Sequence, residues 1–387
     1  VSVRASDQMV LVEGTPPADG KFVVQRPLAG YQPEFASEHF VIVGGGPAAA
    51  AAADSLRQEG YRGKLTVLSA DSVPPFDRTK LSKAMAAEPA LLRTAEHYAQ
   101  HDIELMLESR VESVDPAQRT VEFQSKNGRD MYTPDDRPSS IASKTIPGRD
   151  ASARSFLPAQ PEDSKRIHAA GQGADAVLIG SSFIALESAA YLVANGAKSV
   201  TVLARDPVPF KALFGEEAGK AARRLHESKG VKFGGSVRSE AEVGRHPACS
   251  ALCGGHRLHA QHRLPAAGGL LAGGKPGSPL VVGPDLRSPS DSNVFLAPAT
   301  SSATGTGRRR RRRAAWPPGR LLGKPVRQPL ATSFFWTLMF GTGFRYTALA
   351  AGGDGRPSSP WKRAVVAEPK EEFKFMTYLV GEADQAF

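Results

Sequence analysis

The chain is poor in cysteine, with only Cys249 and Cys253 among 387 residues. So few cysteines cannot form a disulfide framework, and they fit a reducing compartment. Long apolar runs are also missing: no stretch reaches about eighteen apolar residues, so we expect no helix that spans a bilayer. The sequence starts at Val1 and shows no signal or transit peptide. We therefore expect a fragment or a processed chain.

Several catalytic motifs are absent as well. The turn at 180–184 reads Gly-Ser-Ser-Phe-Ile and lacks the second glycine of a nucleophile elbow. No glycine loop ends in Gly-Lys-Ser or Gly-Lys-Thr, which excludes a P-loop. A zinc cluster could be drawn from both cysteines and three histidines, but their segment has no framework to bring them together, and we expect no metal; these residues are Cys249, Cys253, His256, His259 and His262.

The positive charge is concentrated in one place. The formal net charge is +10, and six of these charges come from Arg308–Arg313, so the rest of the chain carries only +4. An arginine run attracts phosphate polymers. No aromatic platforms or recognisable binding fold flank it, so a solvated tail is the favoured interpretation and we do not expect nucleic acid as a partner.

Length and composition indicate a globular chain of two or three domains, because 387 residues exceed what one hydrophobic core usually organises. Apolar residues make up 41% and charged residues 23%, with many loop formers (38 Gly, 30 Pro). The polar, proline-dotted residues 1–38 are typical of a tail or linker. Residues 241–330 are dominated by Gly, Pro, Ser and Arg, which predicts a poorly ordered stretch.

The first strong pattern is a strand, a glycine turn, a helix and a second strand. Phe40–Val43 is an apolar run of the buried parallel type, followed by Gly44-Gly45-Gly46-Pro47 and an alanine-rich helix to Glu59. Gly60 ends that helix, and Lys64–Leu68 returns as a strand. This βαβ unit of about thirty residues predicts a parallel sheet.

Such a turn brings main-chain N–H groups and a helix N-terminus against a pyrophosphate. Gly44 and Gly46 have to be glycine because side chains would block that approach, and Pro47 and Ala48 open the helix. The acid expected to bind ribose hydroxyls is Asp71, slightly late after the second strand. The turn therefore predicts dinucleotide binding; the alternative is a glycine-rich turn that binds nothing.

A second βαβ unit starts 136 residues later, counted from Gly44 to Gly180. Its small positions after Gly180 are Ser182 and Ala185, and a serine still admits and hydrogen-bonds a phosphate. Arg205 follows the second strand where a carboxylate is more usual, and a cation there suits a 2′-phosphate. NADPH is therefore as plausible as NADH, unless Arg205 is a solvated arginine. The unit comprises strand Ala176–Ile179, helix Phe183–Ala194 and strand Ser199–Leu203.

Between the units, residues 77–87 and 90–100 are predicted to be helical. An alternation over Arg110–Val114 and Thr120–Phe123 predicts a hairpin with one wet face.

Four segments resemble the apoptosis-inducing-factor-like flavoproteins, which belong to the FAD-dependent pyridine nucleotide oxidoreductases and are related to the reductases of ferredoxins. The resemblance covers about 39–235 and 332–380. Its segments are Phe40–Ala53, Pro75–Lys83, Pro161–Asp163 with Ala176–Leu192, and Phe334–Thr337 with Phe340-Gly341.

The resemblance implies an α/β fold with two Rossmann-like three-layer dinucleotide-binding domains, the NAD(P) domain being inserted in the FAD domain, and a partial C-terminal α/β domain. The implied organisation is a tail at 1–38, the first part of the FAD domain at 39–150, the NAD(P) domain at 151–240, the poorly ordered stretch at 241–330 and the C-terminal domain at 331–387.

The resemblance also implies roles for single residues. Arg78 and Lys83 match positions that contact FAD, Glu187 matches an acid near the nicotinamide, and Trp336 matches an aromatic near the flavin edge. From the residues alone, the cations could be a basic helix start at the surface, Glu187 an ordinary helix carboxylate and Trp336 a core residue.

Two departures from the family concern the flavin site. Residues 133–144 replace a family strand of sequence Leu-Leu-Ala-Thr-Gly, and Pro298 and Ala299 replace a Gly-Asp pair that would hold the ribityl chain. An exon error or a shifted reading frame would explain 241–330, which sequencing the transcript would test. Residues Val1–Ser6 look like the end of the Rieske-type module that some relatives carry, but the sequence contains no Cys-x-His pair, so we expect no iron-sulfur cluster.

The combined prediction is a flavoprotein that passes hydride from NAD(P)H to FAD. No acid–base residue of its own is required, because the cofactors supply the chemistry. No Cys-x4-Cys pair follows the first unit, which argues against a disulfide reductase and leaves a ferredoxin or Rieske-type protein or a quinone as acceptor. A homodimer and a cytoplasmic or mitochondrial location are compatible with this prediction. Its rival is a non-catalytic scaffold with a damaged flavin site.

Overall fold

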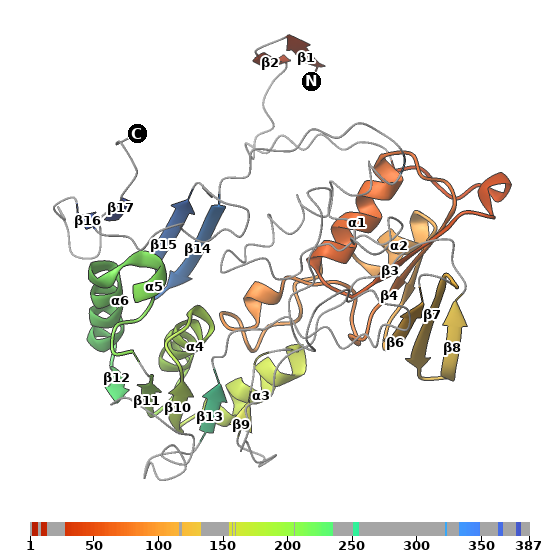
Figure 1. Cartoon of the computed structure of the whole chain (residues 1–387). Coiled ribbons are helices and arrows are strands. Elements are labelled where there is room, and N and C mark those ends of the chain that lie inside the picture. Colours follow the sequence, from red (N-terminus) through yellow and green to blue (C-terminus); the bar gives the residue numbers. More distant parts are fainter. Residues whose placement is uncertain are drawn as a thin grey trace.

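The computed structural model describes residues 28–115, 118–132, 158, 160–204, 206–234, 322 and 333–348, and the backbone of six further strand segments at 2–6, 9–13, 155–156, 251–254, 363–366 and 377–380. Two α/β units lie side by side, one from the red-orange and one from the green part of the sequence (Figure 1). The parallel sheets and the helices between their strands give the α/β class that the sequence predicts.

The first unit is built on a parallel sheet with the order β3-β4-β5. Its helix α1 packs on one face of the sheet, where Ala53 and Leu56 meet Leu65, Val67 and Tyr98. The strand predicted at 64–68 and the helix that follows the glycine turn are both confirmed. The elements are β3 (His39–Val43), α1 (Pro47–Gln58), β4 (Lys64–Leu68), α2 (Ala95–Gln100) and β5 (Ile103–Met106).

An antiparallel sheet covers the opposite face of this unit. Strands β6 (Arg110–Asp115) and β7 (Thr120–Ser125) form the predicted hairpin, and β8 (Gly128–Tyr132) adds a third strand. The buried side of the hairpin packs against β3 and β4 through Val114, Val121 and Phe123, which contact Val41, Val43 and Leu68. The first unit therefore has three layers: helix, parallel sheet and antiparallel sheet.

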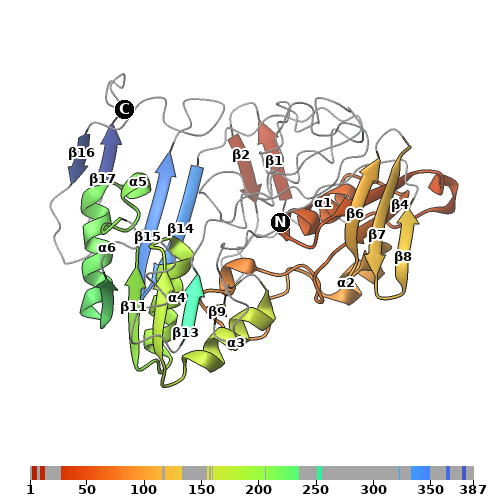
Figure 2. The same ribbon diagram turned by 60° about the horizontal axis from the view of Figure 1, so that its bottom comes forward.

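The second unit holds a parallel sheet of five strands in the order β12-β11-β10-β13-β9 (Figure 1). Figure 2 shows part of this sheet, including β11 and β13, from a second direction. Helices α3 and α4 contribute Ile167 and Leu186 to the core on one face, and Val177, Ile179 and Leu203 pack together on the other. The elements are β9 (Ser155–Phe156), α3 (Pro161–Gly171), β10 (Asp175–Ile179), α4 (Phe183–Ala194), β11 (Ser199–Leu203), α5 (Lys211–Phe214), α6 (Glu216–Ser228), β12 (Val231–Gly234) and β13 (Ala251–Gly254).

The helix predicted at 77–87 is wrong. The structure has only a 3₁₀ turn there, η2 (Arg78–Lys80), whose start is capped because Asp77 accepts hydrogen bonds from both the N–H and the hydroxyl of Thr79. The helix predicted at 90–100 begins only at Ala95, since Thr94 caps its start and Leu91 bridges to Phe76. These tertiary contacts outweigh the local helical pattern.

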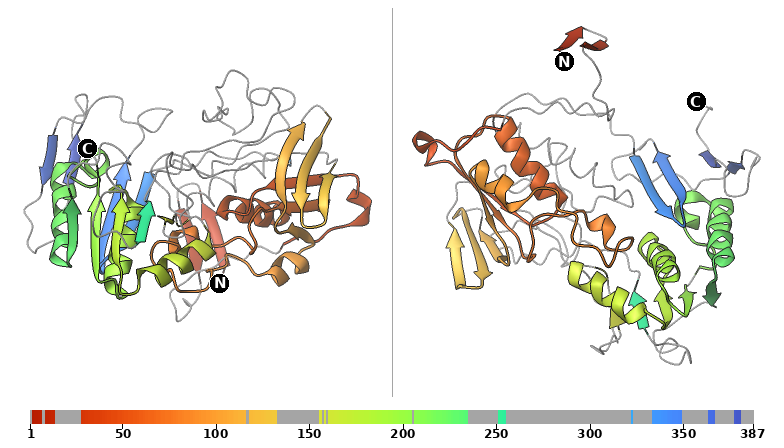
Figure 3. Two further views of the ribbon diagram at one scale, coloured as in Figure 1. Left: turned by 90° about the horizontal axis from the view of Figure 1, so that it is seen from below. Right: turned by 180° about the vertical axis from the view of Figure 1, so that it is seen from behind.

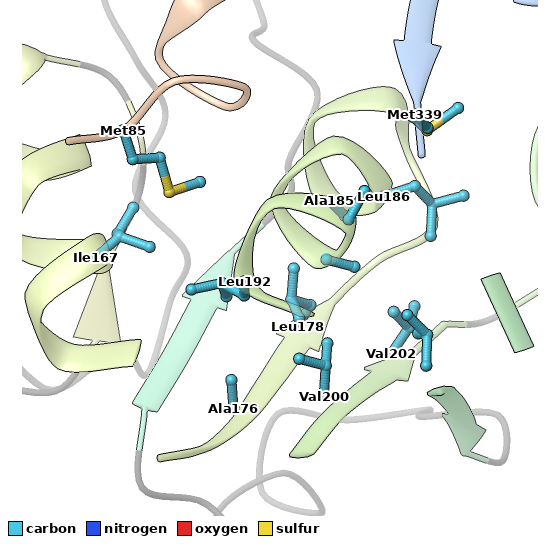
Figure 4. Packing of buried hydrophobic residues seen from close by; sticks show 13 residues of the cluster. Met85, Ile167, Ala176, Leu178, Ala185, Leu186, Leu192, Val200, Val202 and Met339 are labelled. Carbon is cyan, nitrogen blue, oxygen red and sulfur yellow. The ribbon is translucent and has the colours of Figure 1, made fainter. Parts of the chain in front are cut away.

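Residues 75–87, which we call the connecting segment, link the first unit to the second. Met85 is fully buried in the core of the second unit, beside Ile167 (Figure 4). The hydroxyl of Ser164 donates to the carbonyl of Leu81 at 2.9 Å, and the N–H of Ala86 donates to Tyr191 Oη at 3.2 Å. The segment therefore leaves β4 of the first unit and docks on α3 and α4 of the second.

The chain ends add paired strands. Residues 1–38, predicted as a linker, contain the hairpin of β1 (Ser2–Ser6) and β2 (Met9–Glu13), and the short helix η1 (Pro33–Phe35). In the predicted poorly ordered stretch, β13 is an inner strand of the second sheet.

The described C-terminal part consists of two antiparallel hairpins and shows none of the helices of the predicted α/β domain (Figure 3). Their strands are β14 (Ser333–Met339) with β15 (Thr342–Ala348), and β16 (Arg363–Val366) with β17 (Thr377–Val380). None of the helices in the described ranges has the length and apolar character that a bilayer span needs.

Candidate functional site

The two glycine turns have the same construction. Gly44 follows β3 with φ +120°, and Gly180 follows β10 with φ +96°, a left-handed range that favours glycine. The N–H of Gly44 donates to the carbonyl of Leu68 at 2.7 Å, and the N–H of Gly180 donates to the carbonyl of Leu203 at the same distance. Each turn is thereby fixed to the end of the neighbouring parallel strand, and the helix start lies at the carboxyl edge of its sheet.

The helices that follow these turns begin in an electrostatically distinct way. α1 starts after Gly46 and α4 after Ser182, and neither has a side-chain cap or an acid in its first turn. By contrast α2, α3 and α6 each carry at least one acid in the first turn, and only the four-residue α5 among the other described α-helices carries none. The positive helix ends at the two turns are therefore uncompensated by acids in their own first turns and fit phosphate groups.

The space around the first turn distinguishes the roles of Gly45 and Gly46. A Cβ on Gly46 would meet nothing within 4 Å, whereas a Cβ on Gly45 would lie 1.9 Å from Ser69 Oγ. Gly46 therefore borders open space in front of α1, where Ala48 is already buried, and this fits the bulk of a bound pyrophosphate. Sequence reasoning missed Gly45, which is needed for packing of the turn itself; the run of three glycines was the only signal.

Asp71, predicted to bind ribose, lies in an ion pair. Its carboxylate accepts hydrogen bonds from Arg78 Nη2 on Oδ2 and from Gln160 Nε2 on Oδ1, the latter at 2.9 Å. The guanidinium of Arg78 also lies 4.8 Å from the ring centre of Phe76. The structure therefore places Asp71 and Arg78 together beside the first turn, with Asp71 Oδ2 3.0 Å from the Cβ position of Gly45.

Lys83 and Glu187 connect the two units. Lys83 Nζ lies 2.7 Å from Glu187 Oε2, and the Glu187 side chain is only 5% exposed. Lys83 belongs to the connecting segment that follows the first unit, and Glu187 lies in α4 just over one turn after the second glycine turn. Two residues singled out by family resemblance are thus brought together from segments 104 positions apart in the sequence.

Two further side chains that sequence reasoning missed reach the same carboxylate. Ser82 donates to Glu187 Oε2, and Thr337 of β14 donates to Glu187 Oε1. Both hydroxyls lie in segments that carry the family resemblance, but no local pattern distinguishes them from ordinary polar residues. Glu187 is therefore held from two separate parts of the chain, the connecting segment and β14.

Trp336 is not a core residue, because 52% of it is exposed. Along β14 exposure alternates: Trp336 and Leu338 face outward, while Thr337 and Met339 are buried. Arg205, Cys249, the three candidate metal-binding histidines and Arg308–Arg313 lie outside the described residues. Within the described ranges, no three His, Cys, Asp or Glu side chains gather in a way that could hold a metal ion.

A buried histidine braces α4 beside Glu187. His226 of α6 is fully buried, with Nδ1 2.7 Å from the carbonyl of Ala222 and Nε2 3.2 Å from the carbonyl of Leu186. Its ring meets Phe340 edge to face at 5.2 Å. Burial lowers the pKa of His226 below its ordinary value.

This burial predicts a pH dependence of stability. The unfolded chain binds a proton at His226 below about pH 6.5, while the folded chain resists protonation. We expect the free energy of unfolding to be at its full value above that pH and to fall as the pH drops below it, by at most about 1.4 kcal/mol per pH unit from this group. Urea titrations at pH 7.5 and 5.5 measure the free energy of unfolding at each pH. The difference between the two pH values should be smaller in His226→Gln than in the parent chain. An equal difference in the two proteins would contradict this prediction.

The chain is similar to known proteins in sequence and in fold. The profile of the family described as pyridine nucleotide-disulphide oxidoreductase matches residues 38–245, more than half of the chain. The chain belongs to this family. Within it, the chain is 32% identical over 239 residues to apoptosis-inducing factor 3 of Mus musculus, covering 60% of this chain and 38% of that protein. It is 34% identical over 203 residues to a terpredoxin reductase of a Pseudomonas species, covering 50% of this chain and 48% of that protein.

The chain thus spans less than half the length of these two relatives in the pyridine nucleotide-disulphide oxidoreductase family. Its fold also matches a solved structure, the covalent complex of putidaredoxin reductase with putidaredoxin, with a TM-score of 0.74 at 20% identity. That match covers 89% of this chain and 87% of the other. Both glycine turns, the connecting segment and Glu187 all lie within the residues that the family profile matches.

Proposed function

We propose that the chain is an FAD-dependent oxidoreductase that passes hydride from NAD(P)H to FAD. The observation that carries this proposal is the ion pair of Lys83 with Glu187 at 2.7 Å. It joins the segment after the first glycine turn to the helix that begins at the second. A pair of dinucleotide sites coupled in this way is suited to holding two redox cofactors against each other.

The chain's own residues would position the cofactors. Gly44 and Gly46 leave room for the FAD pyrophosphate at the start of α1, and Gly180 and Ser182 do the same for NAD(P)H at α4. Arg78 and Lys83, held by Asp71 and Glu187, would bind the FAD from the side of the connecting segment. When bound, the two cofactors supply the hydride donor and acceptor, and the protein supplies position and electrostatics.

The proposed domain organisation is an NAD(P) domain inserted in an FAD domain. The five-stranded parallel sheet supports an NAD(P) domain from about 151 to 240, extended by β13. The sheet of β3, β4 and β5 with its antiparallel cover supports the FAD domain from 39 to 150. The C-terminal part from 331 would complete the site through β14.

The proposed electron acceptor is an iron-sulfur protein of ferredoxin or Rieske type, or a quinone. A solved relative in fold is a complex of a reductase with putidaredoxin. Trp336 and Leu338 give β14 an exposed apolar face, with 52% and 49% of each residue accessible, and Thr337 on the opposite face contacts Glu187. This surface would place an acceptor next to the flavin edge.

The first test measures whether the chain binds flavin. After incubation with FAD and gel filtration, we expect about one flavin per chain, seen as absorption near 450 nm. With ferricyanide as artificial acceptor, this holoprotein should oxidise NADH or NADPH, and comparing the two KM values identifies the nucleotide. A folded, colourless chain would contradict the proposal.

A non-catalytic scaffold is the second candidate. It is favoured by Pro298 and Ala299, which replace the Gly-Asp pair expected to hold the ribityl chain. The scaffold predicts the same fold with no flavin retained. Restoring the pair with Pro298→Gly and Ala299→Asp distinguishes the two: a gain of flavin in the variant over a colourless parent supports the scaffold.

A further inference from the structure

The inner face of β14 is part of the site around Glu187. Thr337 is completely buried, and its hydroxyl donates a hydrogen bond to Glu187 Oε1. The other oxygen, Oε2, accepts from Ser82 and lies 2.7 Å from Lys83 Nζ. Each carboxylate oxygen thus has its own donors. The donor to Oε1 lies 150 positions after Glu187 in the sequence, and the hydroxyl donor to Oε2 lies 105 positions before it.

This division of donors fixes the orientation of the carboxylate. Oε2 faces the connecting segment and Oε1 faces β14, so the carboxylate plane spans the two. Among the charged side chains of the described ranges, Lys83 alone forms an ion pair with Glu187. Removal of the Thr337 hydroxyl would take away this donor from Oε1 and leave the contacts of Oε2 with Ser82 and Lys83 in place.

Tight packing sets the position of Thr337. Met339, the next inward residue of β14, is buried in the core of the second unit, and Figure 4 shows it close to Leu186 of α4. Across the hairpin, Thr337 pairs with Phe344, which packs against the same core. His226 supports α4 at the carbonyl of Leu186 and contacts Phe340. The hydroxyl therefore comes from a strand packed on the core of the second unit rather than from a loop.

We infer that Thr337 is a positioning residue that orients Glu187, and through it Lys83, for the hydride transfer proposed above. The part of this inference that concerns hydride transfer rests on the proposed function. The orienting contact itself is a property of the folded chain. It makes the C-terminal hairpin a structural part of a site whose other residues come from the two dinucleotide-binding units.

The first test uses the chain without cofactor, so it does not depend on flavin binding. Thr337→Val keeps the shape and removes the hydroxyl, whereas Thr337→Ser keeps the hydroxyl and removes a methyl group. Each is combined with Glu187→Ala in a double-mutant cycle measured by urea unfolding. We expect Thr337→Val to raise the unfolding equilibrium constant about tenfold relative to Thr337→Ser when Glu187 is present, and to give no such excess with Glu187→Ala.

The second test uses the flavin-loaded chain and measures flavin reduction by the nucleotide in a single turnover. We expect Thr337→Val to slow the limiting rate of reduction about tenfold with the apparent Kd for the nucleotide within about twofold of the parent, and Thr337→Ser to restore the rate. Equal behaviour of the valine and serine variants in the cycle would overturn the inference even if flavin binds. Coupling in the cycle without any flavin binding would support the contact and refute the proposed function instead.

Discussion

Replacing Gly46 by leucine is expected to yield a folded chain that has lost FAD. The φ of −93° and ψ of 179° at this residue suit any amino acid, including one before Pro47, and a Cβ there meets no atom within 4 Å. The side chain would instead fill the space assigned to the pyrophosphate. We expect the urea midpoint of the cofactor-free chain to stay unchanged and the affinity for FAD to fall at least about a hundredfold, since phosphate contacts and shape are both lost.

The neighbouring Gly45 provides the matched control. A Cβ there would lie 1.9 Å from Ser69 Oγ and 2.9 Å from Ser69 Cβ. Ser69 is fully buried and its hydroxyl accepts from the N–H of Asp71, so it cannot move without disturbing that turn. Gly45→Ala should therefore cost about 1–3 kcal/mol of stability even without flavin. If Gly46→Leu bound flavin normally, the first turn would not be the FAD site.

Arg57→Met is expected to destabilise the first unit more than Gly45→Ala does. The guanidinium is fully buried and donates to four main-chain carbonyls: those of Tyr61, Gly63, His101 and Asp102, at 2.6–3.0 Å. Methionine has similar length but no donors, so two buried acceptors, the carbonyls of Tyr61 and Gly63, and two partly buried ones would lose their partners. We expect the free energy of unfolding to fall by about 3–5 kcal/mol.

Arg62→Met is the control for this substitution. Arg62 is exposed and donates to the side chain of Gln32, so its removal should change the free energy of unfolding by less than about 0.5 kcal/mol. Urea unfolding of both variants, followed by circular dichroism, makes the comparison. A small effect of Arg57→Met would show that the guanidinium does not hold the connections that follow α1 and α2.

Glycines at the ends of helices explain which elements could be predicted from the sequence. The strand Lys64–Leu68, the helix Phe183–Ala194 and the strand Ser199–Leu203 have the predicted bounds. Gly60 and Gly196 mark the ends of the two helices with left-handed backbone, at φ +92° and +90°. These boundaries are local, so a single sequence contains the information that sets them.

The errors arise where distant contacts decide the structure. Residues 77–87 carry a helical pattern, yet Met85 is buried in one unit while Phe76 bridges to Leu91, and a continuous helix is replaced by turns. Ser82 and Thr337 meet only at Glu187, across long stretches of chain. Family resemblance pointed to Lys83 and Glu187 as separate residues, but only the structure shows that they form a pair.

Glu187 is the residue at which three parts of the chain meet. The carboxylate receives donors from the connecting segment and from β14, and its own helix begins at the second glycine turn. A change in any of the three parts would alter the geometry between the two proposed dinucleotide sites. The relative orientation of the cofactors is therefore the property on which the proposed electron transfer depends.

The most direct measurement is anaerobic flavin reduction by nucleotide in one turnover. One equivalent of NADH or NADPH is mixed with the FAD-loaded chain, and absorbance near 450 nm is followed. Two adjoining dinucleotide sites predict rapid and stoichiometric bleaching by at least one of the nucleotides. A chain that holds FAD but keeps its full absorbance with both nucleotides would contradict the proposed hydride transfer.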